Sequence, residues 1–147
     1  MLTTPHAVTG AAIAALMPSP WIALPAAVAS HFVLDHIPHW QETLAPYIPT
    51  RRTYIRIFFD LTLAGLLVGL VASWYPDRAV MIWLGAAAAN APDLDTLTVL
   101  VPGLRRGPIQ QFWDWHCRIQ RETNDLFGVY TQIATITLCM SLAYFMR

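Results

Sequence analysis

Long uncharged runs, divided by prolines and by short polar clusters, dominate the chain. The first 34 residues carry no charged side chain, and Pro18 and Pro20 divide them into two predicted helices. The first spans about 5–16, with Thr4 as its cap, and the second restarts at Pro20 and ends at Pro38. Because proline interrupts helical hydrogen bonding, Pro25 must kink the second helix or delay its regular part, leaving about 13 regular residues.

Three further helices are predicted along the rest of the chain, at about 54–75, 79–91 and 126–146. The last is the only uninterrupted uncharged run that reaches the ~20 residues needed to cross a bilayer. Gly65 and Gly69 lie four positions apart, a spacing that permits close helix contact, and we interpret it as packing within the chain.

A fourth segment, about 109–120, is amphipathic and rich in tryptophan, which favours a helix lying in the headgroup zone. The pattern therefore predicts an all-α fold: an integral membrane bundle of four to five short helices plus this interfacial amphipathic helix. We expect residues 1–147 to form a single multi-span membrane domain.

Composition strengthens the membrane interpretation and excludes one class of partner. The chain is 56% hydrophobic and 12% charged, about half the charged fraction of a typical soluble domain, and its mean hydropathy is +0.45. Its formal net charge is zero, with nine basic residues that are all arginine. No basic excess exists to neutralise phosphates, so we expect no nucleic-acid partner.

If the helices alternate direction, most arginines fall on one side of the membrane. That side receives seven arginines, against Arg78 and Arg147 on the other: Arg51, Arg52, Arg56, Arg105, Arg106, Arg118 and Arg121. The positive-inside rule makes it the cytoplasmic face of the inner membrane, with the amino terminus inside and the carboxyl terminus outside. The same side receives all five histidines and four aspartates, Asp35, Asp60, Asp93 and Asp95.

Spacing indicates what this polar layer can do. His31 and Asp35 are four apart, so they share one helix face, a good arrangement for binding a transition metal. Asp93 and Asp95 lie two apart and repel each other unless a cation or a shared proton intervenes. Asp60 lies in an apolar helix at a cost of about 2.5–3.5 kcal/mol, which calls for a partner, either Arg56 or a metal.

Each of these features also has a plain structural interpretation. His31 and Asp35 can be a hydrogen-bonded pair, Asp93 a cap, and Asp60 the partner of Arg56 in an ion pair. His6 is poorly explained as a cation near a helix start, because the helix dipole disfavours it there. One His/Asp metal centre accounts for all of these features together, whereas the roles of His36 and His39 stay open.

Three motifs resemble a known family of small bacterial membrane proteins. They are Thr4-Pro-His6, His31-Phe-Val-Leu-Asp35 and Pro92-Asp93-Leu-Asp95, followed less clearly by His116. The chain resembles membrane-bound metal-dependent hydrolases, and its His-x-x-x-Asp element is similar to one in zinc-dependent phospholipases C. The resemblance implies a ligand set, namely His6, His31, Asp35, Asp93, Asp95 and His116. The family's late segment carries two histidines and this chain has one, which leaves open whether one or two ions bind.

These features lead to a functional expectation. We expect a metal-dependent hydrolase of a phosphoester, from a lipid or another membrane-associated substrate, using zinc or manganese. Asp35, Asp93 and His116 are the candidate catalytic residues, and Asp60 is a further ligand or supports the ligands. We expect a polar pocket that opens toward the cytoplasmic headgroups beside Arg118 or Arg121.

Two other classes of function fit the same residues. One is a non-catalytic membrane protein that binds or transports metal, and the other is a structural partner protein with a polar His/Asp network. The sequence contains no Gly-x-Ser-x-Gly, Walker or Gly-x-Gly-x-x-Gly motif, so serine hydrolase and nucleotide-binding roles lack support.

Overall fold

A computed structural model describes residues 1–41, 50–104 and 106–147, and within these ranges the protein is helical, with no strand. An isolated parallel bridge joins His39 to Glu122. The α-helices are α1 (Thr3–Leu16), α2 (Pro20–Asp35), α3 (Arg51–Trp74), α4 (Ala79–Asn90), α5 (Leu97–Leu100), α6 (Pro108–Ile119) and α7 (Asp125–Phe145). Short 3-10 helices connect them: η1 (Pro76–Arg78), η2 (Ala91–Thr96) and η3 (Pro102–Leu104).

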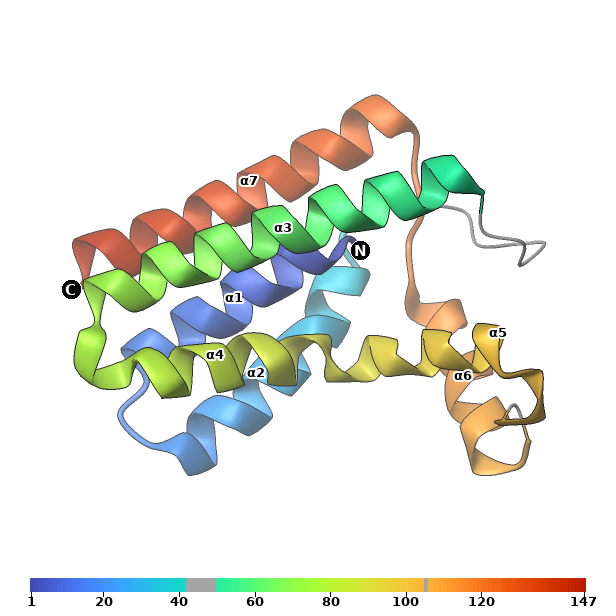
Figure 1. Cartoon of the computed structure of the whole chain (residues 1–147), viewed down its shortest axis with the longest axis horizontal. Coiled ribbons are helices and arrows are strands. Elements are labelled where there is room, and N and C mark those ends of the chain that lie inside the picture. Colours follow the sequence, from blue (N-terminus) through green and yellow to red (C-terminus); the bar gives the residue numbers. More distant parts are fainter. Residues whose placement is uncertain (42–49, 105) are drawn as a thin grey trace.

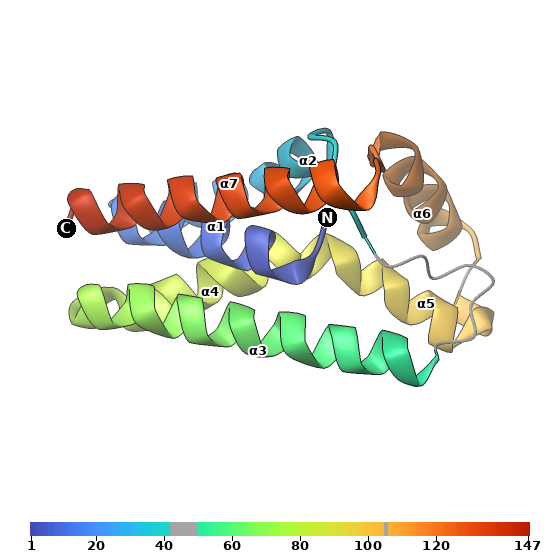
Figure 2. The same cartoon turned by 90° about the horizontal axis from the view of Figure 1, so that it is seen from above.

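Helix α1 is the centre of the bundle and packs against α2, α3, α4 and α7 (Figures 1 and 2). Successive long helices alternate in direction, so the start of α1, the ends of α2 and α4 and the starts of α3 and α7 lie toward one end of the molecule (Figure 1). The connection between α3 and α4, which contains η1 (Pro76–Arg78), and the carboxyl terminus lie at the opposite end (Figure 1). Of the arginines predicted for the polar end, Arg105 is outside the described residues.

The predicted helices are present, and their boundaries differ in informative ways. Helix α2 starts at Pro20 and continues through Pro25, so its regular part is not delayed to Leu24. Helix α3 starts at Arg51, three residues before the predicted start, because Thr50 and Thr53 form a capping box. Thr4 is not the cap of α1, since the helix already begins at Thr3. Most of the predicted connection before α3 lies outside the described residues.

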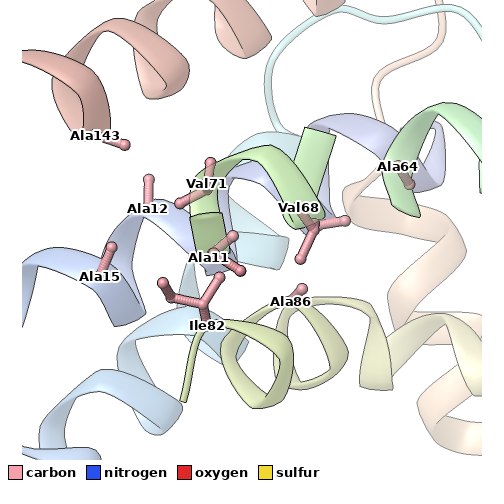
Figure 3. Close-up of a cluster of buried hydrophobic side chains, with 11 residues drawn as sticks. Ala11, Ala12, Ala15, Ala64, Val68, Val71, Ile82, Ala86 and Ala143 are labelled. Carbon is pink, nitrogen blue, oxygen red and sulfur yellow. The ribbon is translucent and has the colours of Figure 1, made fainter. Parts of the chain in front are cut away.

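The apolar core is built mainly from small side chains. Alanines of α1, α3, α4 and α7 surround three larger buried residues, Val68, Val71 and Ile82 (Figure 3). Small side chains allow helix axes to approach closely, which compensates for the limited apolar area that each alanine buries. Close packing therefore fixes how α1 lies between its neighbours.

Helices α1 and α4 approach each other closely at Gly10 and Gly85. A Cβ atom on Gly10 would lie 2.3 Å from the Gly85 carbonyl oxygen, and a Cβ on Gly85 would lie 2.5 Å from the Ala14 Cβ. Our expectation that Gly65 and Gly69 form the close contact is wrong. A Cβ on Gly65 would meet no atom within 4 Å, and one on Gly69 would meet only Trp83 at 3.9 Å.

We expect Gly85→Val to destabilise the protein by about 1–3 kcal/mol, because the new side chain would push α1 away from α4. Gly65→Ala is the matched control. It should be neutral or stabilising by up to about 1 kcal/mol, since alanine is the better helix former and has open space there. Thermal unfolding of both variants in detergent measures the effect. Equal midpoints would contradict the close α1–α4 contact.

Two of the described helices, α3 and α7, are long and apolar enough to cross a membrane. Only 22% and 17% of their most apolar windows are buried, so most of these side chains face outward. Helices α1, α2 and α4 have 14, 16 and 12 residues, which correspond to about 21, 24 and 18 Å. They are thus shorter than the ~30 Å hydrocarbon core of a bilayer.

Candidate metal centre

Four segments bring histidine and aspartate side chains together near the polar end of the bundle. His6 comes from the first turns of α1, His31 and Asp35 from the end of α2, and His116 from α6, while Asp93 and Asp95 lie on η2. Three overlapping groups have ligand atoms within 4.8 Å of one another: His6, His31 and Asp93; His31, Asp35 and His116; and Asp93, Asp95 and His116. The structure thus brings together six of the seven predicted ligands.

Asp35 is the central residue of this cluster and is fully buried. Its Oδ2 lies 3.2 Å from Nε2 of His31 and 3.0 Å from Nε2 of His116. Its Oδ1 lies 3.3 Å from Nε2 of His6 and accepts a hydrogen bond from the amino group of Met1 at 2.7 Å. One carboxylate therefore contacts all three histidines.

In His31 and His116, the hydrogen bond made by Nδ1 determines that the other ring nitrogen, Nε2, is the one with a lone pair directed at the cluster. Nδ1 of His31 lies 2.7 Å from the Ala89 carbonyl oxygen, which can only accept, so Nδ1 carries the proton. Nε2 of a neutral His31 therefore presents a lone pair to Asp35. Nδ1 of His116 lies 2.7 Å from Oδ2 of Asp95, which favours the same tautomer in a neutral His116.

The two Nε2 atoms lie only 3.1 Å apart, beside Oδ2 of Asp35. With both rings neutral, three electron-rich atoms would face one another without a proton between them, which is unfavourable unless a positive charge is present. Distances of this size also match the edges of a metal coordination shell, roughly 3.0–3.4 Å for bonds of about 2.1 Å. The geometry therefore suits a metal ion or, in its absence, an added proton.

The electrostatics of His116 agree with this requirement. Burial opposes its protonation, but the hydrogen bonds with Asp35 and Asp95 outweigh burial and raise the pKa of His116 to about 9. A protonated His116 can donate from Nε2 to Asp35 and from Nδ1 to Asp95. The proton on Nε2 of His116 would then take the position that a metal ion would occupy between Nε2 and Asp35.

His6 is buried, and neither of its ring nitrogens has a hydrogen-bond partner. Its ring stacks on His31, with centroids 4.0 Å apart and planes inclined by 19°. Its Nε2 has only the 3.3 Å contact with Oδ1 of Asp35, and a buried polar group left unsatisfied costs on the order of 1–3 kcal/mol. A cation bound to the lone pair of His6 would satisfy that nitrogen, while the other nitrogen keeps its proton.

Asp93 is the most accessible member of the cluster. Its side chain is 27% exposed, and its Oδ1 lies 3.5 Å from Nε2 of His31. Leu94 and Leu97, which follow it in the chain, are 62% and 50% exposed. The chain next to the accessible ligand candidate therefore exposes apolar side chains.

The chain matches no family model, no curated protein and no solved structure. The arrangement of the cluster itself is therefore the basis for its chemistry. Three imidazoles and up to three carboxylates suit a borderline transition metal better than calcium or magnesium, which prefer shells made of oxygen alone.

Asp60 has a different place from the other predicted ligands and belongs to none of the three groups. Its two carboxylate oxygens accept hydrogen bonds from the backbone amides of Thr3 and Thr4, at 2.8 and 3.1 Å. The Thr4 hydroxyl lies 2.6 Å from Oδ1 of Asp60. Asp60 thus caps α1, which has no capping side chain of its own.

The remaining predicted partners and histidines lie around the cluster. The guanidinium of Arg56 lies over the Trp40 ring, 5.2 Å from its centroid. His36 is exposed, and its Nδ1 donates to the Phe32 carbonyl oxygen. His39 is buried, with Nδ1 donating to the Ile37 carbonyl oxygen and Nε2 without a hydrogen-bond partner.

Two groups that were not predicted from the sequence contact His31 and His116. The Ala89 carbonyl orients His31, and a backbone acceptor leaves no signal in side-chain patterns. The amide nitrogen of Gln120 lies 3.5 Å from Nε2 of His116. Gln120 could have been found, because it follows His116 by four positions, the spacing that places two side chains on one helix face.

A hollow of about 490 Å³ lies on α3, away from these ligands. It is lined by Arg51, Tyr54, Ile55, Phe58 and Phe59, so it is mostly apolar. The polar pocket that we expect beside Arg118 or Arg121 remains a prediction. The Arg118 side chain is exposed and donates from Nε to the Asp114 carbonyl oxygen, and the backbone amide of Arg121 donates to the Asp35 carbonyl oxygen.

Proposed function

We propose that this protein is a membrane-embedded, metal-dependent hydrolase that acts on a phosphoester of a lipid or another membrane-associated substrate. The observation that carries the proposal is the meeting of two Nε2 atoms and a carboxylate oxygen at 3.0–3.2 Å in a buried position. The Met1 amino group neutralises Oδ1 of Asp35 but does not lie between the two facing Nε2 atoms. A divalent metal would supply a positive charge there together with hydrolytic chemistry.

The donors divide into ligands and supporting groups. His6, His31 and His116 would bind the ion through nitrogen, with Asp35 and Asp93 as carboxylate ligands, a mixture that suits zinc or manganese. Asp95 would hold the His116 ring in place through Nδ1, as carboxylates often do behind metal-binding histidines. Each Nε2 atom has one lone pair and cannot bridge two ions. A second ion would therefore have to share carboxylate ligands with the first.

A bound divalent ion would supply Lewis acidity, which makes water a better nucleophile and neutralises charge on phosphoryl oxygens. The chain's own residues would perform the proton transfers. Asp93 is the accessible carboxylate of the cluster, so it is placed to accept a proton from the attacking water. Buried Asp35 and His116 would hold the ion and set the charge around it.

The membrane part of the proposal is supported by the depth of Asp60, which binds the start of α1 two residues before His6. Asp60 lies nine residues after Arg51, the start of α3, which corresponds to about 13 Å along the axis of that helix. With α3 spanning the bilayer and its arginine-rich start at the cytoplasmic face of a bacterial inner membrane, the cluster lies below the headgroups. Helices α1, α2 and α4 would then accompany α3 and α7 as shorter spans, with α6 at the interface.

A lipid substrate agrees with the surroundings of the accessible ligand. The exposed leucines beside Asp93, together with Phe112 and Trp115 of α6, can contact acyl chains while a phosphate reaches the ion. The motif resemblance to membrane-bound metal-dependent hydrolases and to zinc-dependent phospholipases C points to the same chemistry.

A second candidate, a non-catalytic metal-binding protein, is favoured by the deep burial of the ligands. The side chains of His6, His31 and Asp35 are fully inaccessible, and that of His116 is 2% exposed. An ion that is held only to stabilise the bundle or to be stored does not require access for a substrate.

Metal content and hydrolysis together test the proposal. We expect the detergent-purified protein to contain at least one zinc or manganese ion per chain and to hydrolyse a phosphomonoester lipid in mixed micelles. His31→Gln should lose both properties, because His31 belongs to two of the three ligand groups. His36→Gln, the matched control at an exposed histidine, should keep both.

The possible outcomes separate the two candidates. Metal without hydrolysis of any phosphoester tested would favour the non-catalytic protein. A protein that binds no metal at pH 7.5 would overturn both and leave a polar network that is satisfied by protonation.

A further inference from the structure

Helix α6 has an unusual relation to the rest of the protein, because its one buried residue is a candidate ligand. Of residues Pro108–Ile119 only His116 is buried, and the helix lies beside the end of the bundle (Figures 1 and 2). The apolar side chains of Ile109, Phe112 and Trp115 remain 36–45% exposed. Trp113 and Ile119 are half-buried, so apolar contacts hold α6 only in part, and no apolar residue of the helix is fully buried.

The contacts of His116 join α6 to two other elements. Its Nε2 lies 3.0 Å from Asp35 of α2 and 3.1 Å from His31, and its Nδ1 lies 2.7 Å from Asp95 of η2. The ring centroid of Trp115 also lies 5.1 Å from that of Phe32. The strongest polar contacts of α6 are thus the ones that a metal ion would replace or reinforce.

The two ends of α6 differ in how they are held. At its start, Gly107 has φ +57 and open space around it, so the chain turns there without packing. After its end, the backbone of Arg121 is tied at both sides, since its amide donates to the Asp35 carbonyl and its carbonyl accepts from the His39 amide. Helix α6 can therefore loosen from its start, and its full release also breaks the two backbone hydrogen bonds of Arg121.

We propose that binding of the metal ion through His116 holds α6 against α2 and η2, and that loss of the ion releases the helix. This inference rests on the proposed metal centre but not on catalysis. Helix α6 would then be docked on the bundle when the metal site is filled and released when the site is empty. The release would also uncover the buried ligands, giving an ion a route in and out.

Trypsin provides a direct test, because cleavage after Arg118 requires local unfolding of α6. We compare the full-length protein in detergent with excess zinc and after removal of zinc by a chelator, and identify the cut sites by mass spectrometry. At free zinc about 100 times Kd, mass action predicts up to about 100-fold slower cleavage at Arg118. Cleavage after Arg52, in the first turn of α3, is the internal control and should change little.

Variants sharpen the comparison. His116→Ala should be cleaved rapidly at Arg118 with or without zinc, whereas His36→Ala should behave as the unmodified protein does. The comparison with and without zinc needs no variant, so poor folding of His116→Ala does not affect the test. Zinc uptake with unchanged cleavage at Arg118 would show that the ion does not hold α6, and would leave the proposed metal centre unaffected. Uptake of neither zinc nor manganese would overturn both.

Discussion

Asp35→Asn should lower zinc affinity by at least about 100-fold while the protein stays folded. Asp35 contacts Nε2 of His6, His31 and His116, so removing its charge weakens the whole ligand set at once. The asparagine amide has the same shape and can donate a hydrogen bond to the lone pair of a neighbouring imidazole. It can therefore satisfy His31 and His116 without a cation, while its carbonyl oxygen still accepts from the Met1 amino group, so we expect the fold to persist.

Equilibrium dialysis against zinc, followed by elemental analysis, measures this effect, and thermal unfolding checks the fold. Asp114→Asn is the matched control, because the Asp114 side chain is exposed and accepts from Gln110 on the same helix. The control should bind zinc as the unmodified protein does. If Asp35→Asn retains full zinc affinity, Asp35 is not a ligand and zinc binds without its carboxylate.

Much of the cluster could be predicted from the sequence because its members follow simple spacing rules. His31 and Asp35 lie four apart on one helix, and Asp93 and Asp95 lie where proline ends another. Alternation of helix direction then places them at the same end of the bundle, as the structure shows (Figure 1). Periodicity and breaker residues determine such features, and both are local properties of the sequence.

Features that depend on contacts between distant helices could not be predicted in the same way. The spacing of Gly65 and Gly69 favoured close packing, yet the close approach is at Gly10 and Gly85, which belong to different helices. Only the relative rotation of α1 and α4 determines which glycines meet. A pattern within one helix carries no information on that rotation.

The same limit applies to Asp60, whose position in an apolar helix predicted a partner without identifying it. The two partners considered were Arg56 and a metal, whereas the carboxylate binds the start of α1. The unsatisfied amides at a helix start are common to every helix and are therefore weak signals in a sequence. Here they are decisive because α1 lacks a capping side chain.

Asp60→Ala should lower both stability and metal affinity. It removes hydrogen bonds to the amides of Thr3 and Thr4 and to the Thr4 hydroxyl, and leaves these donors without their partner at an expected cost of about 1–3 kcal/mol. His6 follows Thr4 by two positions in the same helical turn. Loosening this turn should move the His6 ring away from Asp35 and weaken metal binding by about 10–100-fold.

Two further variants separate the effect of charge from that of hydrogen bonding. Asp60→Asn keeps one carbonyl acceptor, so its loss of stability should fall between that of Asp60→Ala and no change. Asp77→Ala is the control at the far end of the bundle, in η1, and should leave zinc affinity unchanged. The zinc affinity of Asp60→Ala decides what Asp60 does: lower stability with unchanged affinity would make it a cap for α1 alone, with no effect on the position of His6.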